Sequence, residues 1–182
     1  MEIFNTREDL FKSFEKNLVI AEIGIFKGEF SKFIFNNLFP KKLILVDIFE
    51  GYVSSGDKDG INISGTNMED EYLRLNDYFK DNENVFLVKE RSENFIPTLE
   101  DNSLDLIYLD ADHEYSSVKN ELTLSFPKIK DGGYICGHDY TSPRFEGLVR
   151  AVNEFSKEMD LPITHMGMDG CPTFCIAKRK KN

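Results

Sequence analysis

The 182-residue sequence lacks the features of a membrane protein, a disulfide-rich secreted protein or a nucleic-acid-binding protein. No apolar stretch approaches the roughly 18 residues that a membrane span needs, and the N-terminus has no basic or apolar segment of the signal-peptide kind. The 3 cysteines are an odd number without a framework spacing, so we expect reduced thiols. The sequence has only 22 Lys and Arg residues against 32 Asp and Glu residues. The resulting net charge of -10 disfavours contact with phosphates. We therefore expect a cytoplasmic chain without membrane or nucleic-acid partners.

The sequence also lacks repeats, low-complexity tracts and Pro/Gly/Ser linkers that would divide it. A chain of this length can bury roughly two thirds of its surface on folding, which is enough for one full core. We predict a single domain over residues 1–182, with an N-terminal helix within residues 1–17. A homo-oligomer is left open.

Apolar runs alternate with segments of helical periodicity along most of the chain. The predicted strands are Leu18 to Ile23, Lys42 to Ile48, Val85 to Val88, Leu104 to Leu109 and Gly133 to Gly137. The predicted helices are Thr6 to Lys16, Phe30 to Leu38, Glu69 to Lys80, Glu93 to Leu99, Tyr115 to Phe126 and Phe145 to Met159. This alternation predicts an α/β fold with a parallel sheet covered by helices on both faces. The last two apolar runs, Ile163 to Met168 and Thr173 to Lys178, flank a short turn and predict a closing antiparallel pair.

Residues 50–68 contain four Gly and show no periodicity. Loops of this length inside a domain are usually functional or disordered, and we interpret this one as a substrate lid.

A glycine turn follows the first predicted strand. It contains Glu22, Gly24 and Gly28, and Asp47 ends the next predicted strand. Ligands of open parallel sheets bind outside the carboxyl ends of the strands, and an acid at this distance from a glycine turn can reach ribose hydroxyls. An acid at position 22 and Phe26 within the turn disfavour a pyrophosphate. S-adenosylmethionine, which carries an ammonium, a carboxylate and a ribose but no phosphate, suits these residues better.

A second polar cluster follows the fourth and fifth predicted strands. Asp110, Asp112 and His113 come after one strand, and His138 and Asp139 come after the other. Asp110 or Asp112 could merely cap the following helix. Carboxylates with an imidazole could instead hold a divalent metal such as Mg²⁺.

Four segments together resemble a known family: Ala21 to Gly28, Leu45 to Asp47, Ile107 to Tyr115 and Asp131 to Tyr140. They are similar to class I S-adenosylmethionine-dependent methyltransferases, and more narrowly to the small-molecule branch that includes macrocin-type sugar O-methyltransferases. The resemblance covers about residues 18 to 178. It implies a Rossmann-like three-layer sandwich with a mostly parallel seven-stranded sheet and an antiparallel last strand.

The resemblance also implies roles for individual residues. The implied cofactor-binding residues are Glu22, Gly24, Gly28, Asp47, Ser92 and Asp110. The implied metal ligands are Asp110, His138 and Asp139, although metal-using relatives have a carboxylate in place of His138, which favours a softer divalent ion. His113, assisted by Asp110, would be the catalytic base.

We therefore expect transfer of a methyl group from S-adenosylmethionine to a hydroxyl of a small polar acceptor such as a sugar. A metal-dependent hydrolase would use the same Asp and His residues but would leave the glycine turn and Asp47 unexplained. In a non-catalytic nucleotide-binding module, His113 and Asp139 would be dispensable.

Overall fold

The structure is a computed structural model that describes residues 1–50, 67–141 and 143–180. The predicted lid lies almost wholly outside the described residues. The other predicted elements are found within one to four residues of their expected bounds.

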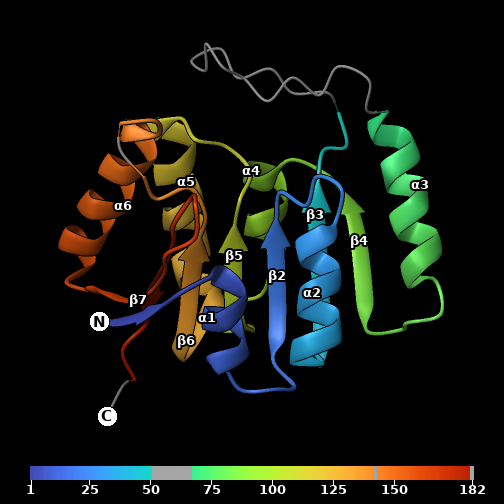
Figure 1. The fold of residues 1–182 in the computed structure, drawn as a ribbon, viewed down its shortest axis with the longest axis horizontal. Coiled ribbons are helices and arrows are strands. Elements are labelled where there is room, and N and C mark those ends of the chain that lie inside the picture. Colours follow the sequence, from blue (N-terminus) through green and yellow to red (C-terminus); the bar gives the residue numbers. More distant parts are fainter. Residues whose placement is uncertain (51–66, 142, 181–182) are drawn as a thin grey trace.

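An eight-stranded sheet forms the centre of the molecule, in the order β1-β7-β8-β6-β5-β2-β3-β4 (Figure 1). The strands are β1 (Glu2–Phe4), β2 (Val19–Ile23), β3 (Lys42–Asp47), β4 (Val85–Lys89), β5 (Leu104–Leu109), β6 (Ile129–Gly137), β7 (Ile163–Gly167) and β8 (Thr173–Ala177). Only β8 runs antiparallel to its neighbours among the described strands. The expected seven strands become eight because Glu2–Phe4 pairs with the edge strand β7.

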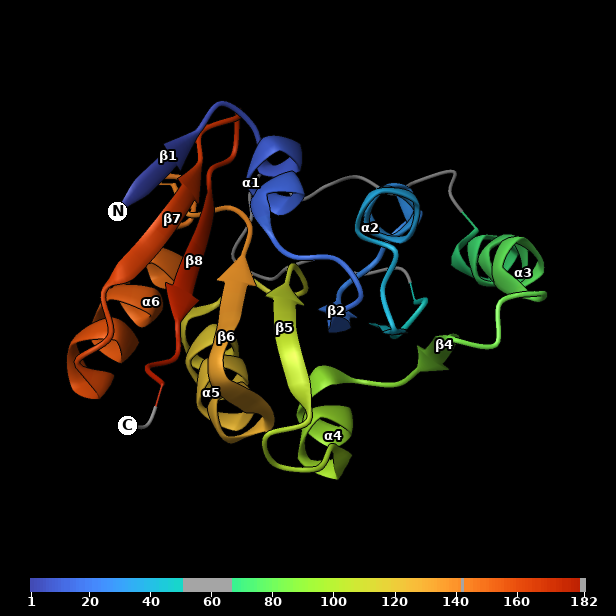
Figure 2. The same ribbon diagram turned by 90° about the horizontal axis from the view of Figure 1, so that it is seen from below.

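Helices cover both faces of the sheet (Figure 2). One face carries α1 (Arg7–Ser13), α2 (Glu29–Leu38) and α3 (Met68–Phe79), and the other carries α4 (Ser92–Phe95), α5 (Tyr115–Ser125) and α6 (Glu146–Met159). Short 3₁₀ turns extend two of them, at Ile96–Thr98 and Phe126–Lys128. Thr6 caps α1, because its hydroxyl accepts the Asp9 N–H at 3.0 Å.

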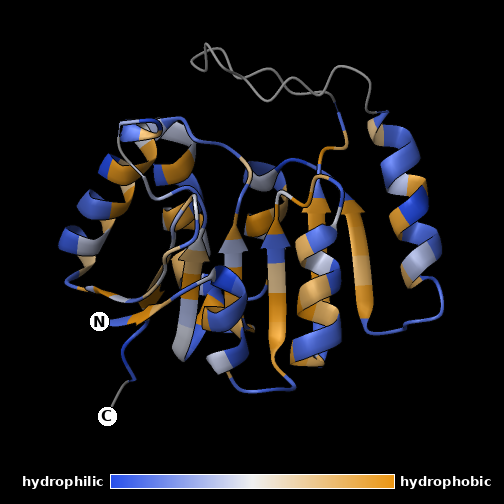
Figure 3. Ribbon diagram, viewed as in Figure 1, coloured by the Kyte–Doolittle hydropathy of each residue, from blue (hydrophilic) through white to orange (hydrophobic). Residues whose placement is uncertain are grey.

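Each helical layer encloses its own apolar cluster against the sheet. Leu43 and Leu45 pack toward α1–α3, whereas Ile44 and Val46 pack toward α4–α6. Alternate side chains of one strand thus enter opposite clusters, as expected for a strand buried on both faces. Figure 3 shows β2, β3 and β4 as mainly hydrophobic and much of α3 and α6 as hydrophilic.

The cysteine prediction was wrong for two of the three residues. Cys136 and Cys175 form a disulfide, and Cys171 is free. The cysteines lie 39 residues apart, but the antiparallel register of β6 and β8 places them directly opposite one another. Their pairing depends on the direction of β8, which cysteine spacing does not reveal.

Within the described residues, no helix combines the length and apolar character needed to cross a membrane.

Candidate functional site

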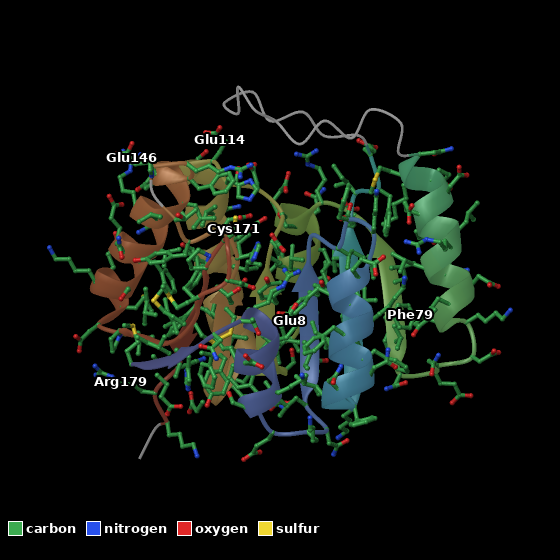
Figure 4. All side chains as sticks on the ribbon, viewed as in Figure 1. Glu8, Phe79, Glu114, Glu146, Cys171 and Arg179 are labelled. Carbon is green, nitrogen blue, oxygen red and sulfur yellow. A yellow bond between two sulfur atoms is a disulfide. The ribbon has the colours of Figure 1, made fainter. Side chains whose placement is uncertain are left out.

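A cavity of about 850 Å³ lies at the carboxyl ends of the parallel strands. Residues that follow β2, β3, β4, β5 and β6 line it, together with residues of α1 and α5. In Figure 4, Glu114 and Glu146 mark the outer ends of α5 and α6, and Cys171, one of the lining residues, lies closer to the strand ends. The cavity therefore lies at the edge of the sheet where the sequence predicts a binding site.

The two glycines of the turn have different surroundings. Gly24 lines the cavity at φ +85°, and a Cβ there would lie 2.3 Å from the backbone oxygen of Asp110. Gly28 begins α2 at φ +72°, and its Cβ would lie 2.3 Å from the Leu75 side chain of α3. Both positions require glycine. Gly28, however, packs against Leu75 and is not among the residues that line the cavity.

Asp47 holds the glycine turn in place. Its Oδ2 accepts the N–H groups of Ile25 at 2.8 Å and Phe26 at 2.9 Å, and its Oδ1 accepts the Phe49 N–H at 2.7 Å. A carboxylate has about four acceptor positions. Asp47, which lines the cavity, therefore keeps about one position for a ligand hydroxyl.

Glu22 is a buried carboxyl group in the cavity wall. Its residue is 2% exposed, and burial raises its pKa to about 8. Glu22 Oε2 and the Ser31 hydroxyl have no hydrogen-bond partner among the described residues. A buried polar atom without a partner is costly, so this position is suited to a ligand that brings a donor or a positive charge.

Asp139, His113 and Asp110 come together at the ends of β5 and β6. His113 Nε2 lies 2.7 Å from Asp139 Oδ2. The His113 ring stacks on Phe145 with 4.3 Å between ring centroids. Asp139 has φ +59°, a conformation that non-glycine residues adopt at a cost and that is frequent at functional sites.

These charges influence one another's protonation. Burial opposes a rise in the pKa of His113, but the hydrogen bond to Asp139 and the nearby carboxylates together raise it. Burial likewise opposes a fall in the pKa of Asp139, but the two histidines together lower it. His138 Nδ1 lies 3.4 Å from Asp139 Oδ2 and 3.6 Å from Asp110 Oδ1, and these carboxylates raise its pKa to about 9 although burial opposes the rise. Burial raises the pKa of Asp110.

One group of donor atoms in the described residues is compact enough to hold a metal ion. Donor atoms of Asp110, His113 and Asp139 all lie within 4.8 Å of one another. The set expected from the sequence was Asp110, His138 and Asp139. The compact group contains His113, and His138 lies beside it. Asp112 instead accepts the N–H groups of His113 and Glu114 in the turn that precedes α5. No side chain caps α5, so the capping role considered above for Asp110 or Asp112 is not found.

Among the residues of the cavity wall that sequence reasoning missed, three contact predicted site residues. Arg7 Nη1 lies 3.2 Å from the Tyr108 hydroxyl and 3.7 Å from Asp110 Oδ2. The second is Phe145, beneath His113. The third is Glu121 of α5, to which the predicted cofactor residue Ser92 donates a hydrogen bond of 2.5 Å. Glu121 could have been recognised from the sequence, because it is an acidic residue on the apolar face of a predicted helix. Arg7 could not, because its position in the sequence does not distinguish it from other charged residues.

The fold and the cavity define an α/β protein of the Rossmann-like methyltransferase type. A family model described as a methyltransferase domain matches residues 21–140, and the chain belongs to this family. An uncharacterized protein of Acanthamoeba polyphaga mimivirus is 31% identical over 157 residues, which cover 83% of this chain. The match spans 65% of that relative's length.

Solved structures share the fold at low sequence identity. The O-methyltransferase NovP has a TM-score of 0.67 at 18% identity, over 96% of this chain and 80% of its own. A protein of Streptococcus mutans assigned as a methyltransferase was solved with S-adenosylhomocysteine (SAH). It has a TM-score of 0.66 at 12% identity, over 94% of this chain and 95% of its own. The N-methyltransferase NodS of Bradyrhizobium japonicum has a TM-score of 0.65 at 14% identity, over 96% of this chain and 95% of its own.

Proposed function

We propose that the protein transfers a methyl group from S-adenosylmethionine to a hydroxyl oxygen of a small polar acceptor such as a sugar. The observation that carries this proposal is the hydrogen-bonded pair His113 and Asp139 beside the cavity that Glu22 and Asp47 line. Membership of the methyltransferase domain family supports methyl transfer, and the fold shared with a structure solved with SAH supports the cofactor.

The cofactor's polar groups match the residues of the cavity one by one. The ammonium group pairs with Glu22, whose buried Oε2 lacks a partner. One ribose hydroxyl donates to the remaining acceptor position of Asp47. Gly24 allows the turn to approach the end of β5 without a side chain in between. Neither a pyrophosphate nor a hydrolytic water accounts for this combination.

Proton removal from the acceptor is assigned to His113. The sulfonium already activates the methyl group, so the protein must align the acceptor oxygen and take up its proton. With Nε2–H of the neutral ring donated to Asp139, Nδ1 is the nitrogen that accepts the proton. Asp139 then stabilises the imidazolium that forms, and Phe145 fixes the plane of the ring.

A divalent ion is part of the proposal because the donor set fits one. Two carboxylates and an imidazole within 4.8 Å are suitable ligands for a divalent ion. Asp110 and Asp139 would hold it with the imidazole of His138, whose Nδ1 lies 3.6 Å and 3.4 Å from their carboxylates, and His113 would remain the base. The ion would lower the pKa of the acceptor hydroxyl.

The proposed acceptor is a small molecule because the chain has too few positive charges to bind a nucleic acid. Oxygen is proposed over nitrogen because an amine loses its proton readily in water, whereas a hydroxyl needs the base that His113 supplies.

The test is a transfer assay with S-adenosylmethionine labelled in its methyl group. Paired panels of small polyols and amines are incubated with the protein, with and without chelator, and the products are identified by mass spectrometry. Label on a hydroxyl oxygen supports the proposal. Label found exclusively on amines would contradict the oxygen assignment, and undiminished transfer by His113→Ala would contradict the base.

A further inference from the structure

Arg144 is a positively charged residue of the cavity wall, just before α6. None of the carboxylates that the structure describes forms an ion pair with it. Other cations of the wall are paired, because Arg7 lies 3.7 Å from Asp110 Oδ2 and Arg91 lies 2.6 Å from a carboxylate oxygen. Acids outnumber basic residues by 32 to 22 in this chain, so an arginine of this wall without an acidic partner is available to a ligand.

The ring of Phe145 connects Arg144 with the proposed base. The guanidinium carbon of Arg144 lies over this ring, 5.0 Å from its centroid, and the same ring stacks on His113 at 4.3 Å. Phe145 is buried, so its ring cannot move freely. A guanidinium that lies over a ring keeps its N–H groups at its edge, where they can donate two parallel hydrogen bonds. One small molecule can therefore contact Arg144 and His113 together.

Close packing holds the segment that carries Arg144 against the start of α5. A Cβ added to Gly147, in the first turn of α6, would lie 3.0 Å from the backbone nitrogen of Tyr115 and 3.3 Å from the backbone oxygen of His113. In Figure 4, Glu114 and Glu146 mark these two helix starts at the same end of the molecule. The fold therefore fixes the separation of Arg144 and His113.

The charge of Arg144 acts on the end of the cavity where Asp139 lies. Burial raises the pKa of the Cys171 thiol, which contacts Asp139, and the charge of Arg144 opposes that rise. Cys171 lines the cavity as well. A negatively charged group of a ligand at this end would be attracted by the same charge.

The proposed function, on which this inference rests, places the acceptor hydroxyl at His113. We propose that the acceptor also carries a carboxylate, which Arg144 binds as an ion pair, so that the substrate is a hydroxy acid of sugar size such as a uronic acid. Pairs of guanidinium and carboxylate are often bidentate, which adds orientation to attraction. Arg144 thus selects the acceptor and directs its hydroxyl toward the base.

A carboxylate suits this position better than a phosphate. One guanidinium balances the single charge of a carboxylate, whereas a phosphate monoester carries about -1.5 to -2 at pH 7. The charge left over would face the carboxylates of Asp110 and Asp139 at the same end of the cavity.

The test compares D-glucuronate with D-glucuronamide, in which a neutral amide of similar size replaces the carboxylate. D-galacturonate and its amide form a second pair, and glucose 6-phosphate represents the phosphates. Each compound is titrated by calorimetry into protein saturated with SAH, and each is offered as the acceptor for labelled S-adenosylmethionine.

The variants are Arg144→Gln, Arg144→Lys and the control Arg150→Gln. Arg150 is exposed on α6, and its guanidinium lies over the Tyr115 ring at 4.1 Å, but it is outside the cavity lining. The control therefore removes a stacked arginine from the same part of the molecule without changing the cavity.

We expect the wild type and Arg150→Gln to bind at least one of the two acids about tenfold or more tightly than its amide. Arg144→Gln should bring these affinities within about threefold. Its loss of transfer to the acid should appear in KM with kcat nearly unchanged, because His113 remains in place. Arg144→Lys should retain part of the preference, because lysine keeps the charge but lacks the planar fork.

Equal binding of acid and amide by the wild type, or binding of neither acid, would overturn this inference. An acid preference that Arg144→Gln retains, or tighter binding of the phosphate, would also overturn it. The proposed function would stand in each case if neutral hydroxyl compounds are methylated, whereas transfer to amines alone would contradict that function itself. The comparison in the wild type needs no variant, so the inference is testable even if Arg144→Gln fails to fold.

Discussion

Replacing Glu22 with Gln should change how the stability of the protein depends on pH. Burial raises the pKa of Glu22 to about 8, from 4.5 for an ordinary glutamate. The folded state therefore binds this proton more tightly than the unfolded state does. The contribution of Glu22 to stability is fully present below pH 4.5 and is lost as the pH rises towards 8.

The magnitude follows from that shift. Each pH unit between the unfolded and the folded pKa of Glu22 lowers the free energy of unfolding by about 1.4 kcal/mol. Between pH 5 and 7 the wild type should therefore lose about 2.5 kcal/mol through Glu22 alone. The amide of Glu22→Gln does not titrate, so the free energy of unfolding of the variant should lack this dependence on pH. Glu121 acts in the same direction but is present in both proteins, so its effect cancels in the comparison.

Urea unfolding across this pH range measures the effect. The control is Glu15→Gln, because Glu15 is exposed and its substitution removes the same charge. The free energies of unfolding of wild type and Glu22→Gln should diverge by about 2.5 kcal/mol over the range, whereas Glu15→Gln should follow the wild type. Parallel curves for wild type and Glu22→Gln would refute the argument that Glu22 is held uncharged by burial.

Substitutions at four further residues test other parts of the site. Asp47→Ala should weaken SAH binding about tenfold or more, because one hydrogen bond from a ribose hydroxyl to the carboxylate is lost. The same substitution should lower the stability of the protein, because three backbone N–H groups lose their acceptor. Unchanged affinity in calorimetry would contradict the assignment of Asp47 to the ribose. His113→Ala should lower turnover by about 10² to 10⁴ with SAH affinity nearly intact, and wild-type turnover in this variant would exclude it as the base. Phe145→Leu should lower turnover about two- to tenfold through loss of the ring stack, whereas Phe145→Tyr should retain it; equal turnover in all three proteins would show that the stack does not position His113. Asp139→Asn should abolish turnover, and added Mg²⁺ or Mn²⁺ should restore chelated wild type but not this variant if a metal activates the acceptor; restoration of the variant would contradict the metal assignment.

The regular elements were predictable because their signals are local. Runs such as Leu43 to Val46 alternate between the two apolar clusters, and their polar ends mark one edge of the sheet. The positions of Glu22, Asp47 and Asp110 at the ends of predicted strands marked them as candidates, and all three line the cavity. The edge strand Glu2–Phe4 was missed because three residues carry too little periodicity to be recognised.

The remaining features depend on tertiary packing. The placement of Gly28 beneath Leu75 requires the position of α3, and the pairing of Cys136 with Cys175 requires the direction of β8. Whether His113 or His138 lies nearer the two carboxylates depends on backbone angles such as the positive φ of Asp139. Spacing in the sequence does not determine any of these.

The most direct test of the account is a calorimetric titration of the purified wild-type protein with SAH, with NAD titrated in parallel. We expect saturable binding of one SAH per chain, weakened at least about tenfold by Glu22→Ala because the charged ammonium group loses its hydrogen-bond acceptor, and no saturable binding of NAD. Binding of NAD with no heat from SAH would contradict the central claim that this cavity holds an adenosyl amino acid.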